Sequence, residues 1–105
     1  VYHPALQTTK NHHIWKRDFS GSSGLFAFSL KKLHSQNKIK KMFSKLKIFK
    51  LGYSWGGYDS LITFPPLSKR KFKSQLKGNL IRVYCGLEDS EDQIKDIITG
   101  LKALQ

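Results

Sequence analysis

The strongest strand signal in the chain is the run Leu80-Ile81-Arg82-Val83-Tyr84-Cys85. Apart from Arg82 it consists of apolar and aromatic residues, a composition typical of a buried strand. Because side chains alternate along a strand, Arg82 shares a face with Leu80 and Tyr84, and the other three residues face the opposite way. An arginine inside an apolar strand is costly unless an anion meets it. That anion is either a carboxylate of the protein or a ligand, and the run alone leaves both open.

A second run, Gly52-Tyr53-Ser54-Trp55-Gly56-Gly57, places a hydroxyl and an indole beside glycines. Glycine lets the backbone turn sharply and approach another group closely. The run continues an alternating segment, 48–53, that predicts a half-buried strand. Its inward side chains are expected to be Phe49, Leu51 and Tyr53. We therefore expect Ser54 and Trp55 to form one wall of a pocket, with Arg82 as its charged partner.

Two further helices and two further strands are expected before residue 80. A short helix over 12–19 would turn Ile14, Trp15 and Phe19 inward, and a strand over 25–30 would place Phe26, Phe28 and Leu30 on one face. Ser35 can cap an amphipathic helix whose apolar residues are Ile39, Met42, Phe43 and Leu46. The run 58–64 is extended and ends at Pro65-Pro66, since proline cannot donate to a ladder. Residues 67–78 are basic and predict a surface loop.

The last helix is predicted from Ser90, which forms a capping box with Gln93. Glu91 and Asp92 in the first turn favour the helix dipole. Capping and dipole interactions account for the acidic cluster of 88–96 better than a pair of catalytic carboxylates does. The buried stripe is expected to be Ile94, Ile97, Ile98, Leu101 and Leu104. The order of elements predicts an α+β fold: a small, antiparallel-rich sheet covered by helices, forming a single domain over residues 1–105.

The net charge of +12 raises the possibility of a basic nucleic-acid-binding module. The lysines are spread along several elements, however, which is more typical of solvated surfaces than of one binding face. We therefore favour no nucleic-acid partner.

Other classes of protein find little support in the composition. An apolar run of the roughly 20 residues needed to span a bilayer does not occur, so we expect no membrane partner. Cys85 is the only cysteine, which excludes an internal disulfide and fits a reducing compartment. The neighbouring His12 and His13 do not face one another on a helix, so we expect no metal site.

Several motifs, in order and spacing, resemble one family over essentially the whole chain: the pyridoxal-phosphate-dependent enzymes of cysteine and methionine metabolism. These motifs are His3-Pro4-Ala5-Leu6, the run Trp15-Lys16-Arg17-Asp18-Phe19-Ser20-Gly21-Ser22-Ser23-Gly24-Leu25-Phe26, the block from Tyr53 to Ile62, Leu80-Ile81-Arg82-Val83, and Gly86-Leu87-Glu88-Asp89. Within the family, Trp55 and the Trp15–Phe19 run favour the cystathionine β-lyases. The γ-specific enzymes usually carry a leucine at the position of Trp55.

The resemblance implies that the chain is the C-terminal domain of an aminotransferase-like, fold-type I enzyme, without the large cofactor domain. It implies that Arg82 binds the α-carboxylate of the substrate and that Ser54 and Trp55 line the pocket beside the Schiff-base lysine. That lysine and most contacts to pyridoxal 5'-phosphate would lie in the large domain, so we expect no catalytic residue here and an inactive fragment.

The activity implied for the complete enzyme is cleavage of cystathionine to homocysteine, pyruvate and ammonia in methionine biosynthesis, by a cytoplasmic homotetramer. The alternatives are the nucleic-acid-binding module and a non-functional remnant of such an enzyme. The coding sequence upstream of the chain would separate the remnant from the enzyme.

Overall fold

The sheet of the protein has the strand order β1-β4-β3-β2 in the computed structural model, which describes residues 1–69, 71 and 75–105. Its elements are α1 (His12–Asp18), β1 (Leu25–Ser29), α2 (Gln36–Phe43), β2 (Lys50–Leu51), β3 (Leu61–Thr63), the 3₁₀ turn η1 (Leu67–Lys69), β4 (Leu80–Tyr84) and α3 (Ser90–Lys102). β1 and β3 flank β4 and run antiparallel to it, and β2 pairs with β3 in parallel. The predicted antiparallel-rich α+β fold is therefore confirmed.

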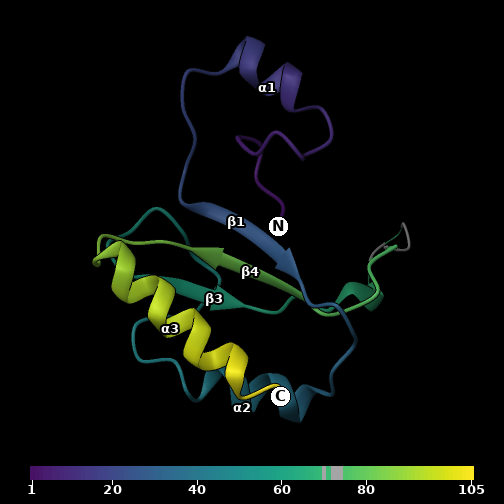
Figure 1. The fold of residues 1–105 in the computed structure, drawn as a ribbon, viewed down its shortest axis with the longest axis vertical. Helices are drawn as coiled ribbons and strands as arrows, with labels where there is room; N and C mark the ends of the chain where they lie inside the picture. The colour runs from purple at the N-terminus through teal and green to yellow at the C-terminus, as the bar shows by residue number, and fades with distance from the viewer. Residues whose placement is uncertain (70, 72–74) are drawn as a thin grey trace.

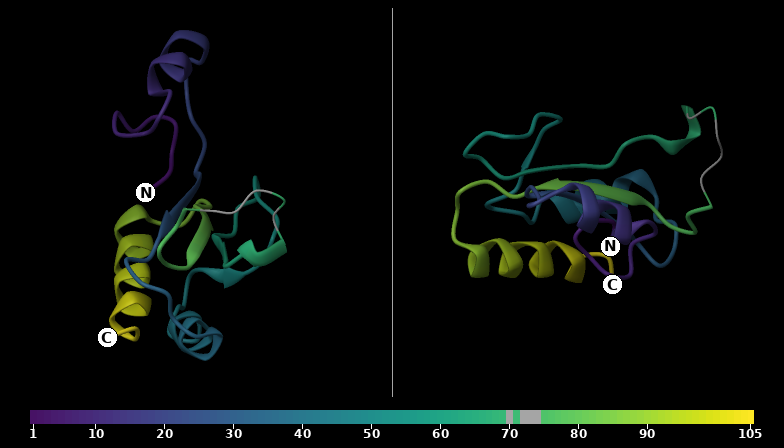
Figure 2. Two further views of the ribbon diagram at one scale, coloured as in Figure 1. Left: turned by 90° about the vertical axis from the view of Figure 1, so that its right-hand side faces the viewer. Right: turned by 90° about the horizontal axis from the view of Figure 1, so that it is seen from above.

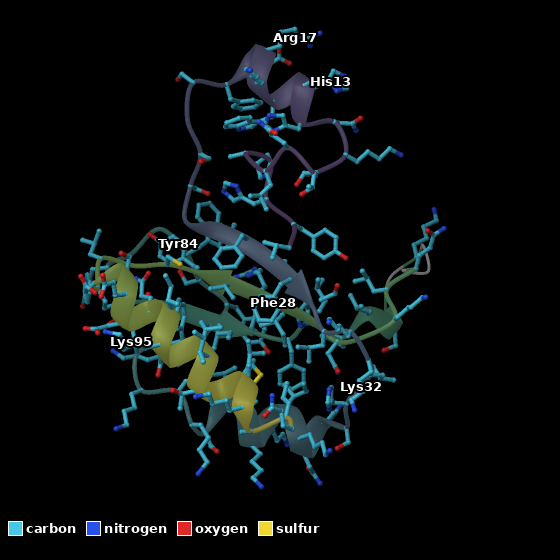
Figure 3. The ribbon with its side chains drawn as sticks, viewed as in Figure 1. His13, Arg17, Phe28, Lys32, Tyr84 and Lys95 are labelled. Carbon is cyan, nitrogen blue, oxygen red and sulfur yellow. The ribbon has the colours of Figure 1, made fainter. Side chains whose placement is uncertain are left out.

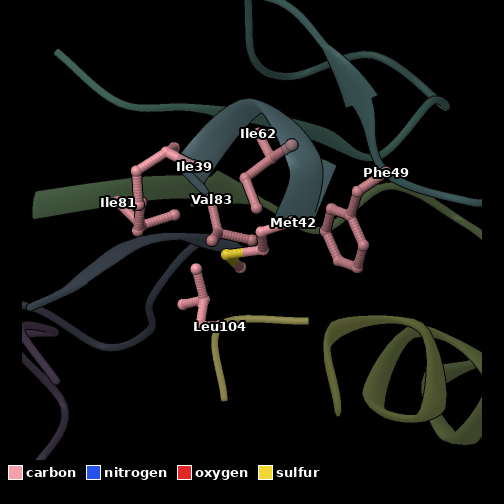
Figure 4. Close-up of a cluster of buried hydrophobic side chains, with 7 residues drawn as sticks. All are labelled: Ile39, Met42, Phe49, Ile62, Ile81, Val83 and Leu104. Carbon is pink, nitrogen blue, oxygen red and sulfur yellow. The ribbon is translucent and has the colours of Figure 1, made fainter. Parts of the chain in front are cut away.

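The helices α2 and α3 cover one face of this sheet (Figure 1). In the right-hand view of Figure 2, α3 (yellow) lies along one side of the sheet. Ile39 and Met42 of α2 meet Ile62, Ile81 and Val83 of the sheet in the core, and Figure 4 shows these side chains together with Phe49 and Leu104. The two helices approach closely at Gly100, where an added Cβ would lie 3.3 Å from the carbonyl oxygen of Met42.

A single carboxylate ties the segment after α2 to α3. Asp96 of α3 is buried and accepts hydrogen bonds from three successive backbone amides, those of Lys47, Ile48 and Phe49, at 2.8, 2.9 and 3.0 Å. Hydrogen bonds to an ionised acceptor are stronger than neutral ones. This contact fixes where the chain enters β2, and it places Phe49 in the core.

The prediction that α1 packs inward is wrong. Phe19 is 63% exposed and Ile14 is 40% exposed, while Trp15 is half-buried beside His12. Figure 3 shows the reason: α1, marked by His13 and Arg17, stands away from the sheet that carries Phe28 and Tyr84. The core face of the sheet is already filled by α2 and α3, so α1 has no place on it.

The segment 48–53 forms a shorter strand than expected, because β2 lies at the edge of the sheet and the chain leaves it at Gly52. Phe49 is buried as predicted, but Leu51 is 66% exposed and Tyr53 is 71% exposed. The prediction of an inward-facing Leu51 and Tyr53 is therefore wrong.

The start of α3 also differs from the prediction. Asp89, rather than Ser90, is the N-cap, and its side chain accepts from the amides of Glu91 and Asp92. Leu104 is buried, and Ile97 and Leu101 pack against the core, but Ile94 and Ile98 are exposed. The buried side of α3 is instead completed by Gln93, Asp96 and Gly100.

Other sequence expectations are confirmed. Ser35 caps α2 by accepting from the amide of Lys38, and the inward face of 25–30 packs against the core. The predicted surface loop over 67–78 begins with the 3₁₀ turn η1, and its positions 70 and 72–74 lie outside the described residues.

Removal of the Asp96 carboxylate is expected to destabilise the domain by about 3 kcal/mol or more, because Asp96→Ala leaves three amides without their acceptor. Urea unfolding of the 105-residue chain would measure the change. The matched control is Asp92→Ala, on the same helix but exposed and 3.5 Å from Lys95. Its cost should stay below about 1 kcal/mol, and equal losses for the two variants would contradict the role given to Asp96.

Candidate functional site

The face of the sheet opposite the core carries Arg82. Ile81 and Val83 are fully buried against the helices, so Arg82 and Tyr84 point to the other side, as the alternation predicts. In the strand register Arg82 lies between Ala27 of β1 and Thr63 of β3. The guanidinium therefore stands near the middle of the sheet, on a face that the two core helices leave open.

The guanidinium of Arg82 meets backbone carbonyls instead of a carboxylate. Its Nη2 donates to the carbonyl oxygen of Tyr53 and, at 3.5 Å, to that of Ser54. None of the ion pairs found within the described residues includes Arg82. Its Nε and Nη1 donors make no hydrogen bond to the described part of the chain. Within the described residues a protein carboxylate is thus not the partner, and Nε and Nη1 remain as separate donors for an anion.

The loop over 53–57 lies beside Arg82, and side chains of β4 donate hydrogen bonds to its backbone. The hydroxyl of Tyr84 donates to the carbonyl oxygen of Gly57 at 2.9 Å. Gly56 has φ +88°, a left-handed conformation that glycine adopts without the strain of a side chain. Ser54 is exposed and Trp55 is 62% exposed. The structure thus brings the Ser54 backbone to Arg82 and leaves both predicted wall residues open to solvent.

Of the loop, only Tyr53 lines a cleft found within the described residues. That cleft, about 840 Å³, lies between α2, the segment after β3 and the start of β4. Its lining includes Phe43, Phe64 and Tyr53 but none of Ser54, Trp55 and Arg82. We attach the site to the guanidinium and not to this cleft, because the cleft is mainly apolar and its lining cation, Lys40, is a point charge without the planar fork of an arginine.

The sequence analysis did not predict a polar cluster around the buried Ser60, which we call the Glu88 cluster. Glu88 accepts from the amide of Ser60 at 2.9 Å and from its hydroxyl at 2.7 Å. The same hydroxyl accepts from the amide of Gly86 and from the side chain of Gln93. Gly86 lies so close to the chain at Tyr58 that an added Cβ would be 2.2 Å from the Tyr58 carbonyl. The cluster fixes the residues that follow the loop against the turn before α3.

The ionised form of Glu88 is strongly favoured. Burial alone would raise the pKa of this carboxyl, but the hydrogen bonds from Ser60 and Gln93 outweigh it and bring the pKa to about 2. Ser60 could not be assigned to Glu88 from the sequence, since no local pattern links residues that are 28 positions apart. Tyr84 could have been found, because alternation places it on the face of Arg82.

Two structural features bear on other classes of function. In the part of the chain that the structure describes, no three side chains of the types His, Cys, Asp and Glu gather as a metal site would need. Within the same part, the helices are too short or too polar to cross a bilayer.

A family model described as Cys/Met metabolism PLP-dependent enzyme matches residues 1–102. The chain is 44% identical over 105 residues to cystathionine beta-lyase MetC of Escherichia coli (strain K12), covering 95% of this chain and 27% of that protein. It is 40% identical over 109 residues to an L-alanine/L-glutamate racemase of Wolbachia pipientis wMel, covering 99% of this chain and 27% of the relative.

Among solved structures, cystathionine gamma synthase from Xanthomonas oryzae pv. oryzae superimposes with a TM-score of 0.80 at 25% identity. The match covers 98% of this chain and 28% of that one. The chain thus spans little more than a quarter of the length of these proteins.

The Glu88 cluster predicts a pH dependence of stability. The folded-state pKa lies below the ordinary value of 4.5, so the stabilisation is present above that pH and is lost as the pH falls towards about 2. Glu88→Gln should remove this part of the decline, as measured by urea unfolding of the chain between pH 2 and pH 7. The control is Glu91→Gln, which removes the same charge from an exposed position and should keep the fall of stability at low pH. A Glu88→Gln protein with the same pH dependence as the wild type would show that the cluster does not lower the pKa of Glu88.

Proposed function

The chain belongs to the Cys/Met metabolism PLP-dependent enzymes, and we propose that it is the substrate-binding C-terminal domain of a cystathionine β-lyase. A cofactor-binding domain would precede it in the complete protein. Support comes from the 44% identical relative named a cystathionine beta-lyase, of which the chain matches 27%. The observation that carries the proposal is Arg82, an arginine set in an apolar strand with two donor groups that make no hydrogen bond to the described residues.

Arg82 is proposed to bind the α-carboxylate of the substrate. A guanidinium offers parallel N–H donors that match the two oxygens of a carboxylate, so the pair fixes orientation as well as charge. Each such pair includes Nη2, so a bidentate substrate would share Nη2 with the carbonyl of Tyr53. Ser54 and Trp55 border the same space, and they would supply a hydroxyl and an apolar wall to the bound amino acid. Holding the amino acid in one orientation matters because its Cα–H bond must be presented to a base in the complete protein.

The donors on this face fit a carboxylate and do not by themselves form a cradle for pyridoxal 5'-phosphate. Pyridoxal phosphate, when bound, supplies an electron sink for the bond cleavages at the substrate. We place the lysine that holds it, and most of its contacts, outside this chain. The contribution of the 105 residues would be to bind and orient the substrate and to form one wall of the site.

The proposed overall reaction is the cleavage of the β-carbon–sulfur bond of cystathionine, with water consumed and homocysteine, pyruvate and ammonia released. A role in methionine biosynthesis follows from that product. Cys85 is free, which suits a reducing compartment such as the cytoplasm. Assembly of the complete protein as a homotetramer rests on the family resemblance alone.

A racemase of small amino acids is the second candidate. The relative named an L-alanine/L-glutamate racemase is 40% identical to the chain, close to the value for the relative named a β-lyase. Arg82 would bind the carboxylate of either substrate, so the wall formed by this chain serves both reactions. The two differ in whether a leaving group departs from the β-carbon or a proton returns to Cα.

The alternative of a nucleic-acid-binding module has weaker support than the enzyme, although one surface of the protein is rich in lysine. Exposed lysines surround α2 on the side of the sheet opposite Arg82, at Lys38, Lys40, Lys41 and Lys45. The apolar residues of α2 face the core, so this surface lacks exposed aromatic rings on which bases could stack.

The complete protein, with this chain joined to its cofactor domain, should release a thiol from L-cystathionine, and the 105-residue chain alone should release none. A thiol reagent measures the product, and the optical rotation of L-alanine is followed in parallel. Racemisation of alanine without thiol release would reject the lyase in favour of the second candidate. Activity of the isolated chain with added pyridoxal phosphate would reject the assignment of the catalytic lysine to another domain.

Replacement of Arg82 should weaken substrate binding without loss of the cofactor. Arg82→Ala removes a bidentate, charge-assisted contact, so the KM for L-cystathionine should rise at least about 100-fold, equivalent to about 3 kcal/mol. The visible absorbance of bound pyridoxal phosphate should stay unchanged. Lys95→Ala removes an exposed charge from α3 and should leave KM unaltered. An unchanged KM for Arg82→Ala would show that the carboxylate binds elsewhere.

A further inference from the structure

The loop that carries Ser54 and Trp55 is held at both ends by side chains of one strand. Arg82 donates to the carbonyl of Tyr53 at the start of the loop, and Tyr84 donates to the carbonyl of Gly57 at its end. The two anchoring residues are separated by one position on β4 and project from the same face. Two positions along a strand span roughly 7 Å. The two anchoring side chains therefore start from points on β4 that are a fixed distance apart.

Within the loop itself, the described contacts are few. Tyr53, Ser54 and Trp55 are exposed, and an added Cβ at Gly56 or Gly57 would meet nothing within 4 Å. The left-handed φ of Gly56 turns the chain immediately before the carbonyl that Tyr84 binds. A loop with so little packing of its own depends on its anchors for a defined position.

The two anchors differ in what else they do. Arg82 is the proposed carboxylate ligand, so a bound substrate and the start of the loop share one guanidinium. Tyr84 is not a ligand in that proposal, and its hydroxyl is engaged with Gly57. The phenol therefore acts on the site only through the position of the loop.

We infer that Tyr84 is a positioning residue for substrate binding, whose hydroxyl holds the far end of the loop so that Ser54 and Trp55 face a substrate held by Arg82. The inference rests on the proposed function, since it assigns these two residues to the substrate pocket. On this inference the Tyr84 hydroxyl determines where Ser54 and Trp55 lie relative to the substrate. It also explains why the loop keeps its course while it is exposed on most of its surface.

The test is Tyr84→Phe in the complete, cofactor-loaded protein. Loss of one neutral hydrogen bond should raise the KM for L-cystathionine by about fivefold, and kcat should change by less than about twofold. The dissociation constant of L-cystathionine from the cofactor-free protein, measured by titration calorimetry, should rise with KM. The visible absorbance of bound pyridoxal phosphate should match that of the wild type.

The matched control is Tyr2→Phe. The Tyr2 hydroxyl lies 3.2 Å from the hydroxyl of Ser29, and the Tyr2 backbone pairs with Ala27, so both of these contacts are to β1. This variant loses one phenolic hydrogen bond beside the same sheet and should retain the wild-type KM. A Tyr84→Phe protein with wild-type KM, or a Tyr2→Phe protein with an equal rise, would overturn the inference.

The outcome can be separated from that for the proposed function. If Arg82→Ala raises KM and Tyr84→Phe does not, the carboxylate site stands and the positioning role of Tyr84 is refuted. If neither variant changes KM, the proposed function fails as well. KM does not depend on the number of active molecules, so the measurement stays decisive even where part of the Tyr84→Phe sample has lost its cofactor.

Discussion

The alternation of side chains along β4 constrains the whole domain. Ile81 and Val83 must be buried, and the helices α2 and α3 bury them from one side. Arg82 and Tyr84 are thereby forced onto the other side, where the loop over 53–57 takes up one donor group from each. A shift of one residue in the register of β4 would move the guanidinium into the core and the isoleucine onto the loop. The packing of the core and the geometry of the candidate site are thus set by the same strand.

Two carboxylates, the buried Asp96 and the half-buried Glu88, determine where the connecting segments lie relative to that strand. Asp96 gathers the amides of 47–49 and so positions the entry to β2, while Glu88 and Gln93 hold Ser60, just before β3. The segment made of β2 and the loop that follows it is therefore fixed at both ends, before β2 and before β3, by acidic groups of the C-terminal part of the chain. Both carboxylates accept hydrogen bonds from backbone amides, and Glu88 also accepts one from a hydroxyl. These bonds offset the free-energy cost of removing the carboxylates from water. Acids that a sequence reader assigns to helix capping thereby serve the site at a distance.

The strands, the cap of α2 and the faces of β1 and β4 could be predicted because each depends on neighbours in sequence. Leu51, Tyr53, Ile94 and Ile98 were misassigned because an apolar pattern does not reveal where a sheet ends or how wide the buried stripe of a helix is. The pairing of Ser60 with Glu88 has no local signature, since it depends on how β3 and β4 come together. For the candidate site, sequence pattern identified Arg82 and the loop, and tertiary contacts added Tyr84 and the Glu88 cluster.

The exposed aromatic residues of the loop argue for the proposed second domain on energetic grounds. Tyr53, Trp55 and Tyr58 are exposed by 71%, 62% and 74%, and they lie close together in sequence beside an arginine with unused donors. Burial of an aromatic side chain contributes roughly 1.5–3 kcal/mol of stabilising free energy. Aromatic residues that stay exposed give a domain none of this stabilisation, and a cluster of them is typical of a surface that another part of a protein covers. If a cofactor domain covers this face, the same side chains become buried, and the free donors of Arg82 become enclosed in a medium where a carboxylate binds more strongly. The apolar surface and the remaining donors of Arg82 would then have one common explanation, a site completed by a part of the protein beyond these 105 residues.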